Sequence, residues 1–358
     1  MTPIYVIIPV YNAEKYIEQA VNSVLEQKYE TIKIVLVNDG STDNSRNICD
    51  SLAQNYACVS VVHQENGGVS RARNAGIDYV LHENVQNAYI AFLDADDLWH
   101  PNFLQSDIVK DIQQQYDICA FGMITCNENA ASFSVPQPYE KKNIAGGYSS
   151  IWTLQEHFAA NLYHISLFQK WDIRFFAGYK YSEDKYFKVL CSFFAKDISF
   201  YPETMYIYRE ASGGAMSRSS TISATDYFLP IIEGWMRTQH VINQYSGLTG
   251  VTTDLGHNLG NVYLLDMICE HYMQQGSRAE IDQIVRQHPN YSFLQNMKPW
   301  NDKDVNYLRK DLYFRHPLFF AVKYRMKGVI RTMMRLALRL PFVQRLNHQR
   351  KYPLNYLP

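Results

Sequence analysis

Three aspartates within four positions, Asp94, Asp96 and Asp97, follow the apolar segment 89–93. Carboxylates this close together repel one another unless a cation lies between them. A hard divalent ion such as Mg²⁺ or Mn²⁺ prefers oxygen ligands and commonly shares them with substrate phosphates. We therefore predict that Asp96 and Asp94 hold such an ion, with Asp97 as the alternative ligand. The simpler interpretation is a solvated acidic turn that precedes a helix.

Four apolar segments alternate with helical patterns over the first hundred residues, and a polar cluster follows each of them. The patterns predict buried strands at 4–8, 32–37, 59–62 and 89–93. Strands that alternate with helices favour a parallel sheet with right-handed crossovers. The carboxyl ends of such strands meet at one edge of the sheet, where ligands bind in open α/β folds. The four polar clusters are therefore expected to form one site.

The polar clusters contain groups that suit a nucleoside diphosphate. Tyr11 can stack on a base, and Asp39 can accept a hydrogen bond from a base N–H. Gly67 and Gly68 let the backbone approach phosphate, while Arg73 and a helix N-terminus add positive potential. The sequence has no Gly-x-x-x-x-Gly-Lys-Ser/Thr motif, and no Gly-x-Gly-x-x-Gly follows the first strand. These absences disfavour a P-loop ATPase and a dinucleotide-binding fold.

In this order and spacing, the four clusters resemble the GT-A family of inverting glycosyltransferases known as family 2. The matching blocks are Pro-Val-Tyr-Asn at 9–12, Asn-Asp-Gly-Ser-Thr-Asp at 38–43, Asn-x-Gly-x-Ser-x-Ala-Arg-Asn-x-Gly at 66–76 and Leu-Asp-x-Asp-Asp at 93–97. The resemblance implies an α/β fold with a mostly parallel, Rossmann-like sheet and flanking helices, a nucleotide-sugar donor such as a UDP-sugar, and Mn²⁺ or Mg²⁺. It implies that the donor is bound by Pro9, Tyr11, Asp39, Asn66, Gly68, Arg73, Asp94 and Arg209.

Two acidic residues, Glu183 and Asp184, follow Ser182 at the start of a predicted amphipathic helix. Their spacing alone favours a structural interpretation over a catalytic one. In that interpretation Ser182 caps the helix, and the two acidic side chains complement the positive end of the helix dipole. In the family that the chain resembles, an Asp preceded by Glu at such a helix start is the general base, which implies Asp184. The sequence contains no Gly-x-Ser-x-Gly motif for a nucleophile, which agrees with direct displacement.

The Arg209 assignment also comes from the resemblance, because bacterial members have a Tyr-Arg step before a Gly/Ser loop. Here the step is Tyr208-Arg209 and the loop is 212–217, which suggests a mobile flap with Arg209 near the diphosphate. Many GT-A enzymes place a histidine metal ligand in this region, but the sequence has no histidine between 165 and 239. We therefore expect water and phosphate to complete the coordination of the ion.

The chain is expected to contain a GT-A domain at 1–215, a helical region at 216–314 and a basic tail at 315–358. Within the domain, 1–100 would bind the nucleotide-sugar and 101–215 the acceptor. The tail carries ten Lys and Arg and no Asp or Glu, in a chain whose formal net charge is −1. Four of these basic residues repeat every four positions opposite an apolar face, namely Lys327, Arg331, Arg335 and Arg339. This pattern predicts a basic amphipathic helix.

Such a helix suits an anionic membrane surface, with 316–351 as the contact segment. The alternative to membrane binding is a helix that packs on the rest of the protein and exposes its basic face to solvent. No nucleic-acid recognition motif accompanies it, so nucleic acid is not expected as a partner. There is no apolar run of 18 residues and no basic leader before the apolar start, and the six cysteines form no Cys-x-x-Cys. We expect a cytoplasmic protein, peripheral at the inner face of the plasma membrane.

The expected function is inverting transfer of a sugar from a nucleotide-sugar to a saccharide or lipid-linked saccharide, in lipopolysaccharide, O-antigen or capsule synthesis. A nucleotidyltransferase is the first alternative, but it usually needs a basic Gly-rich loop at the first strand, which is absent. A non-catalytic nucleotide-sugar-binding module is the second. The presence of Asp94, Asp96 and Asp184 argues against that module.

Overall fold

The computed structural model describes residues 1–101, 103–104, 109, 112–113, 116–127, 133–134, 142–146, 158–179, 181–210, 223–249, 255–274, 276–289, 291–296, 310, 313–315, 320 and 322–330. The chain divides into two compact units. Unit 1 comprises Met1–Arg218 and Arg237–Thr253, and unit 2 comprises Ser219–Met236 and Asp254–Pro358. The loop 212–217 and the basic residues Arg331, Arg335 and Arg339 lie outside the described residues.

Unit 1 is built on a ten-stranded sheet with the order β3-β2-β1-β4-β9-β6-β10-β5, in which β7 pairs with β6 and β8 with β10. Its first half is parallel and contains β1 (Ile4–Val10), β2 (Ile32–Asp39), β3 (Val59–Gln64) and β4 (Tyr89–Phe92). Every residue of β1 and β4 is buried, as expected for apolar strands covered on both faces. The carboxyl ends of these four strands therefore lie at one edge of the sheet, as predicted.

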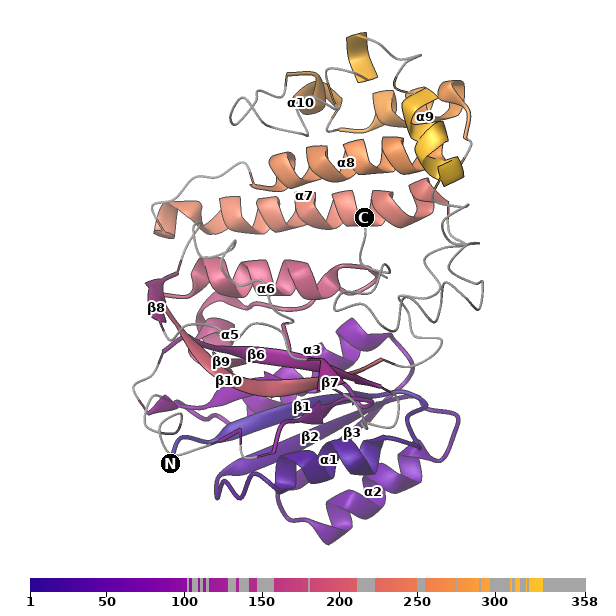
Figure 1. The fold of residues 1–358 in the computed structure, drawn as a ribbon. Helices are drawn as coiled ribbons and strands as arrows, with labels where there is room; N and C mark the ends of the chain where they lie inside the picture. Colours follow the sequence, from indigo (N-terminus) through magenta and orange to yellow (C-terminus); the bar gives the residue numbers. More distant parts are fainter. Residues whose placement is uncertain are drawn as a thin grey trace. The chain divides into compact units, whose positions relative to one another are not determined.

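The helices between these strands are α1 (Ile17–Leu25), α2 (Ser45–Asn55) and α3 (Val69–His82). Figure 1 shows α1 and α2 on one side of the sheet and α6 (Glu183–Phe194) on the other. Helix α3 packs closely on β1, because a Cβ atom on Gly76 would lie 2.3 Å from Cγ2 of Ile7. The absence of a side chain at this position lets the helix approach the strand.

The second half of the sheet is mixed, which differs from the mostly parallel sheet that was expected. It contains β5 (Leu98–Trp99), β6 (Ile118–Asn127), β7 (Phe133–Ser134), β8 (Lys142–Ala145), β9 (Asn161–His164) and β10 (Asp197–Glu210). Strand β9 runs antiparallel to both β4 and β6, whereas β6 and β10 are parallel to each other. Strand β9 thus lies between two strands that precede it in the sequence.

An aromatic core holds α6 against the sheet and the segment that follows α5 (Ser166–Trp171). The rings of Phe175 and Phe187 are stacked, with centroids 3.9 Å apart and planes 4° apart. Phe92, at the end of β4, meets both rings edge-on at 5.3 and 5.4 Å. These contacts fix the position of α6 relative to β4, because buried aromatic rings pack with specific geometry.

Unit 2 is helical and includes the first half of α7 (Ala224–Thr249), α8 (Leu255–Met273), α9 (Arg278–Gln287), α10 (Tyr291–Asn296) and a helix at 322–330. The second half of α7 belongs to unit 1, so the expected boundaries of the helical region do not coincide with this division. Its apolar cluster includes Leu264, Ile268, Tyr272, Ile281, Val285, Phe320 and Tyr324. In the described residues no helix is long and apolar enough to cross a membrane.

Candidate active site

Asp39 ends β2, and its buried carboxylate organises the loop that precedes α3. Its Oδ1 accepts a hydrogen bond from the Gly67 N–H and its Oδ2 accepts one from the Gly68 N–H, each at 2.8 Å. Gln64 donates from Nε2 to the same Oδ1 at 2.6 Å. Gly68 has a φ of 85°, a conformation that glycine adopts without strain. The structural role of Asp39 is thus to shape the predicted phosphate loop. Its contact with a nucleotide base stays a prediction.

Three other predicted donor-binding residues lie around the same edge of the sheet. Tyr11 directly follows β1, and its side chain is 53% exposed, which leaves a ring surface for stacking. Asn66 is exposed and donates from Nδ2 to the Asp39 carbonyl oxygen at 3.1 Å. Pro9 pairs in register with Val37 and is buried within β1. Its side chain therefore belongs to the core, and the contact of Pro9 with the donor stays a prediction.

The aspartate turn after β4 contains one residue that points into the protein. Asp97 is 1% exposed, and it accepts hydrogen bonds from the Tyr206 hydroxyl at 2.6 Å and from the Arg209 N–H at 2.8 Å. Burial, followed by the negative charges of Asp94 and Asp96, raises the pKa of Asp97 to about 8. Both carboxyl oxygens of Asp97 thus accept hydrogen bonds that hold the turn, and the alternative assignment of Asp97 as a metal ligand stays a prediction.

Asp96 has the exposed side chain in this turn, and Asp94 is intermediate. The pKa of Asp96 is raised, first by desolvation of the Asp96 carboxyl group and second by the negative charge of Asp94. A cation between these two carboxylates would relieve their repulsion, and hard oxygen ligands suit Mg²⁺ or Mn²⁺. In the part of the chain that the structure describes, no three His, Cys, Asp or Glu side chains are arranged to hold a metal. The two carboxylates would thus supply only part of a coordination shell.

Arg73, on α3, is buried and links the aspartate turn to α6. Its Nη2 lies 2.8 Å from Oδ1 of Asp94, and its Nη1 lies 3.3 Å from Oε1 of Glu183. The guanidinium also lies over the rings of Phe158 and Phe175, at 4.5 and 5.1 Å. Burial raises the pKa of Glu183, and the positive charge of Arg73 opposes that shift. Arg73 thus contacts two carboxylates here, and its contact with phosphate stays a prediction.

Asp184 follows Glu183 at the beginning of α6 and is half-buried. Its Oδ1 accepts a hydrogen bond from the N–H of Lys185 at 2.8 Å. The helix begins where the sequence indicated, but Ser182 does not cap it through its side chain and has a φ of 62°. Because Arg73 contacts both Asp94 and Glu183, the start of α6 lies one side chain away from the aspartate turn.

Arg209, on β10, is 4% exposed and braces the same turn from the side of α1. Its Nε donates to the Asp96 carbonyl oxygen at 2.7 Å, and its Nη2 donates to Oε1 of Gln19 at 3.0 Å. The guanidinium also lies 5.1 Å from the centroid of the Tyr16 ring. Arg209 therefore shapes the backbone of Asp96 in this structure, and a contact with a diphosphate stays a prediction.

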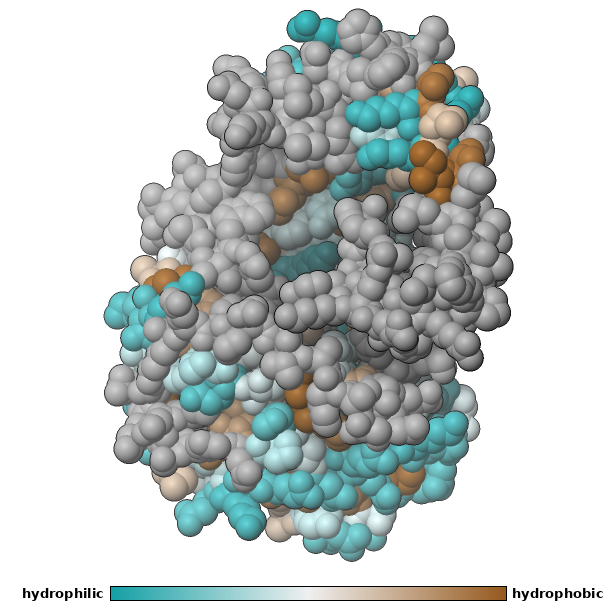
Figure 2. Space-filling model, viewed as in Figure 1, coloured by the Kyte–Doolittle hydropathy of each residue, from teal (hydrophilic) through white to brown (hydrophobic). Residues whose placement is uncertain are grey.

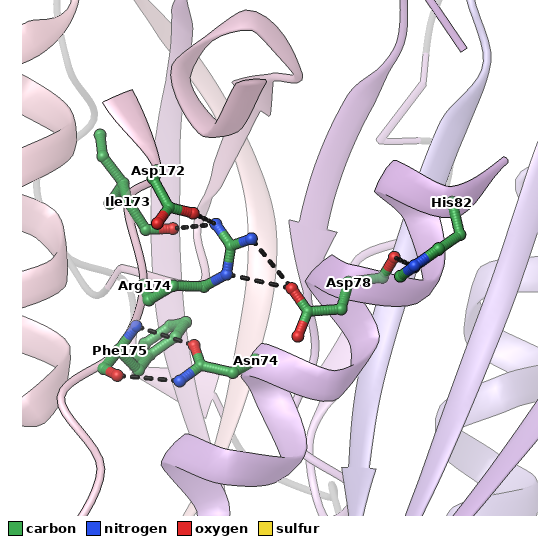
Figure 3. A network of polar contacts seen from close by, with 7 residues as sticks. All are labelled: Asn74, Asp78, His82, Asp172, Ile173, Arg174 and Phe175. Atoms are coloured by element: carbon green, nitrogen blue, oxygen red, sulfur yellow. Dashed lines mark hydrogen bonds and ion pairs between the residues drawn. The ribbon is translucent and has the colours of Figure 1, made fainter. Parts of the chain in front are cut away.

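Two positioning residues were missed by the sequence analysis. Tyr206 accepts a hydrogen bond from the Asp94 N–H at 3.2 Å while its hydroxyl donates to Asp97, and its place in an apolar strand gave no signal. Asn74 donates from Nδ2 to the Phe175 carbonyl oxygen and accepts from the Phe175 N–H, both at 2.9 Å. Figure 3 shows this pair beside the Asp78–Arg174 ion pair. Its position within the block 66–76 was the available signal.

The strand order, the aspartate turn after β4 and the helical C-terminal region define the class of fold as GT-A, which confirms the expected fold class. Residues 5–170 match the model of the family described as Glycosyl transferase family 2. This match covers the segments in which the sequence analysis found its resemblance to family 2 glycosyltransferases, and it confirms that resemblance.

Curated relatives agree with this family. EpsJ of Bacillus subtilis, an uncharacterized glycosyltransferase, is 31% identical over 216 residues, which cover 57% of this chain and 60% of EpsJ. GgaA of the same organism, named a minor teichoic acid biosynthesis protein, is 33% identical over 156 residues, which cover 41% of this chain and 34% of GgaA. In both cases, the matched segment covers less than two thirds of the relative's length.

Solved structures of S. aureus TarS 1-349 share the fold. The complex with UDP-GlcNAc has a TM-score of 0.56 and 21% identity, and the match covers 91% of this chain and 89% of that chain. The complex with UDP has a TM-score of 0.57 and 19% identity, with the same coverage. At this level of identity, the likeness establishes the fold alone.

Proposed function

We propose that the chain is an inverting glycosyltransferase that moves a sugar from a nucleotide-sugar to a saccharide acceptor. The observation that carries this proposal is the link through Arg73, which joins the Asp94 turn to the beginning of α6. A displacement reaction needs the residues that bind the donor and the general base to lie close together. The link brings the predicted donor-binding residue Asp94 and the predicted base Asp184 to the same edge of the sheet.

On the donor side, we infer a UDP-sugar that binds across the ends of β1 and β2. The exposed Tyr11 ring would stack on the base, and the Gly67–Gly68 backbone held by Asp39 would face the phosphates. Asp94 would bind on the sugar side of the phosphates. The TarS complexes with UDP and UDP-GlcNAc support this donor class because they share the fold.

Asp96 and Asp94 would hold a Mn²⁺ or Mg²⁺ ion, with phosphate oxygens and water as the remaining ligands. When bound, the ion supplies positive charge for the departing diphosphate. Asp97, Tyr206 and Arg209 keep the aspartate turn in place through hydrogen bonds to its side chains and backbone. This fixed turn reduces the reorganisation that the site needs when substrate arrives.

In the transfer step, the acceptor hydroxyl oxygen attacks the anomeric carbon while Asp184 takes the hydroxyl proton. The bond between the anomeric carbon and the diphosphate oxygen breaks, and the nucleoside diphosphate leaves with that electron pair. One displacement inverts the anomeric configuration. Glu183, whose carboxylate is paired with Arg73, would orient the start of α6 rather than take the proton.

We infer that the acceptor is a saccharide or lipid-linked saccharide of a surface polymer, such as lipopolysaccharide, O-antigen or capsule. The name of GgaA places that relative in teichoic acid biosynthesis, which supports a surface polymer in general. The proposed place of action is the cytoplasm, peripheral at the inner face of the plasma membrane. The basic segment 316–351 supports an anionic surface as partner.

The experiment that tests the mechanism compares Asp184→Asn with Glu183→Gln. General-base catalysis typically contributes about 10²–10⁴-fold, so Asp184→Asn should lower sugar transfer by at least about 10²-fold. Donor affinity measured by calorimetry should stay unchanged in that variant, and Glu183→Gln should have the smaller effect on transfer. Near wild-type transfer by Asp184→Asn, or a product that retains the donor's anomeric configuration by NMR, would contradict the mechanism.

A second experiment separates the alternatives. UDP-sugar turnover is measured with and without Mn²⁺, for the wild type and for Asp96→Ala. A glycosyltransferase should release UDP in a metal-dependent way that the variant abolishes without unfolding. Release of sugar 1-phosphate in place of UDP would indicate a nucleotidyltransferase, and binding without turnover would indicate a non-catalytic module.

A further inference from the structure

The helix at 322–330 in unit 2 has one face that packs on its own unit. Tyr324 is 5% exposed, and its ring lies 4.5 Å from that of Phe320. Gly328 is buried, and a Cβ atom there would lie 2.2 Å from the carbonyl oxygen of Met273 at the end of α8. This contact leaves no room for a side chain at Gly328, so the inner face of the helix is fixed by close packing.

The opposite face of this helix is apolar and exposed. Val322, Met326, Val329 and Ile330 are 61%, 54%, 44% and 51% exposed. Their spacing of i, i+4, i+7 and i+8 places them on one stripe, turned away from Tyr324 and Gly328. We call these four residues the outer stripe. Among the described residues, they are half of the large apolar side chains that are exposed, gathered within nine positions.

Basic side chains border the outer stripe on both sides. At about 100° per residue, Lys323 and Lys327 fall on one side of the stripe and Arg325 on the other. All three are exposed, and the helix contains no acidic residue. In Figure 2, hydrophobic and hydrophilic residues lie next to each other in the region of the helix that is yellow in Figure 1.

This arrangement discriminates between possible occupants. A second copy of the helix on the stripe would bring the basic borders of both copies together, which is repulsive. Nucleic acid would meet an apolar centre where phosphates need positive charge. An anionic bilayer satisfies both features, because apolar side chains enter the boundary between headgroups and acyl chains while Lys and Arg remain at the headgroups.

We propose that the helix at 322–330 docks the protein on an anionic lipid bilayer through the outer stripe. This deepens the proposed function, since it names the surface by which the enzyme would reach a lipid-linked acceptor. The stripe lies within the basic segment 315–358, whose ten Lys and Arg and lack of acidic residues complement anionic lipid. Each basic residue near such a surface adds to the electrostatic attraction, which is strongest at low salt.

The test uses the full chain and sedimentation with vesicles of phosphatidylcholine, with or without phosphatidylglycerol, at low salt. The stripe variant carries Met326→Asp and Ile330→Asp, which change exposed positions and should not disturb folding. The matched control is Tyr56→Asp, which introduces a negative charge at a side chain in unit 1 that is 39% exposed.

The wild type and the Tyr56→Asp control should sediment with the anionic vesicles and not with the neutral ones. The stripe variant should lose at least about tenfold in partitioning, because it loses apolar insertion and gains negative charge. UDP-sugar turnover on a soluble acceptor separates this proposal from the proposed function, and it should be equal in all three proteins. Equal sedimentation of wild type and stripe variant, or no sedimentation of the wild type, would overturn the proposal. A dimer by light scattering that the stripe variant dissociates would instead identify a second copy as the occupant.

Discussion

Replacing Asn74 with alanine is expected to loosen the start of α6 through Phe175. The substitution removes both hydrogen bonds between the Asn74 amide and the Phe175 backbone, each 2.9 Å long. Phe175 is 2% exposed, so its N–H and carbonyl groups would lose partners in a site that water barely reaches. Each buried polar group left unsatisfied costs about 1–3 kcal/mol, so the local cost for the two groups should be about 2–6 kcal/mol.

The effect should reach the proposed base because the Phe175 ring stacks on Phe187, one turn after Asp184 in α6. It should also reach Arg73, whose guanidinium lies 5.1 Å from the centroid of the same ring. We therefore expect Asn74→Ala to lower sugar transfer more than it lowers affinity for the nucleotide, since Tyr11 and Asp39 do not depend on Phe175.

Asp78→Ala provides the matched control, because Asp78 lies one turn later on α3 and contacts the neighbouring Arg174 at 2.9 Å. The Asp78 side chain is 51% exposed, and an exposed ion pair typically contributes about 0–1 kcal/mol. The assay is hydrogen exchange at the Phe175 amide, since two compact units need not unfold in a single transition. Exchange of the Phe175 amide should be at least about 30-fold faster in Asn74→Ala, because a loss of about 2 kcal/mol in the free energy of local opening corresponds to that factor. Equal exchange rates of the Phe175 amide in Asn74→Ala and Asp78→Ala would show that the Asn74 amide does not hold this segment.

Three other predictions concern single positions in unit 1. Asp39→Ala should weaken UDP binding in calorimetry more than it slows turnover, because it frees the Gly67–Gly68 loop, and an unchanged affinity would count against the assignment. Gly76→Ala should lower the unfolding free energy by about 1–3 kcal/mol in urea titration, because its Cβ would overlap Ile7, whereas a neutral result would show that the helix can shift. Burial lowers the pKa of His164, so the unfolded state binds more protons below pH 6.5 and stability should fall as pH drops through the folded-state pKa. His164→Asn should flatten that dependence in thermal melts, and an unchanged slope would assign it to other groups.

The amino-acid sequence was sufficient to predict the fold class. Apolar runs bounded by polar clusters were enough to locate β1 to β4, because strands buried on both faces need continuous apolar sequence. The same pattern located the helix that begins at Glu183 and the edge at which Asp39 and Asp94 lie. The local pattern is enough to predict this edge, because the carboxyl ends of parallel strands necessarily lie at the same edge of the sheet.

The exposure of each carboxylate and its hydrogen-bond partners, by contrast, depend on the three-dimensional fold. Asp96 and Asp97 are neighbours with the same chemistry, yet Asp97 is buried because Tyr206 and the Arg209 backbone, over a hundred positions away, supply its hydrogen bonds. The pairing of Arg73 with Glu183 spans 110 positions and depends on β9 and α6 returning to the sheet. Such long-range contacts leave no periodic trace in the sequence, since they depend on where the chain folds back and not on local spacing.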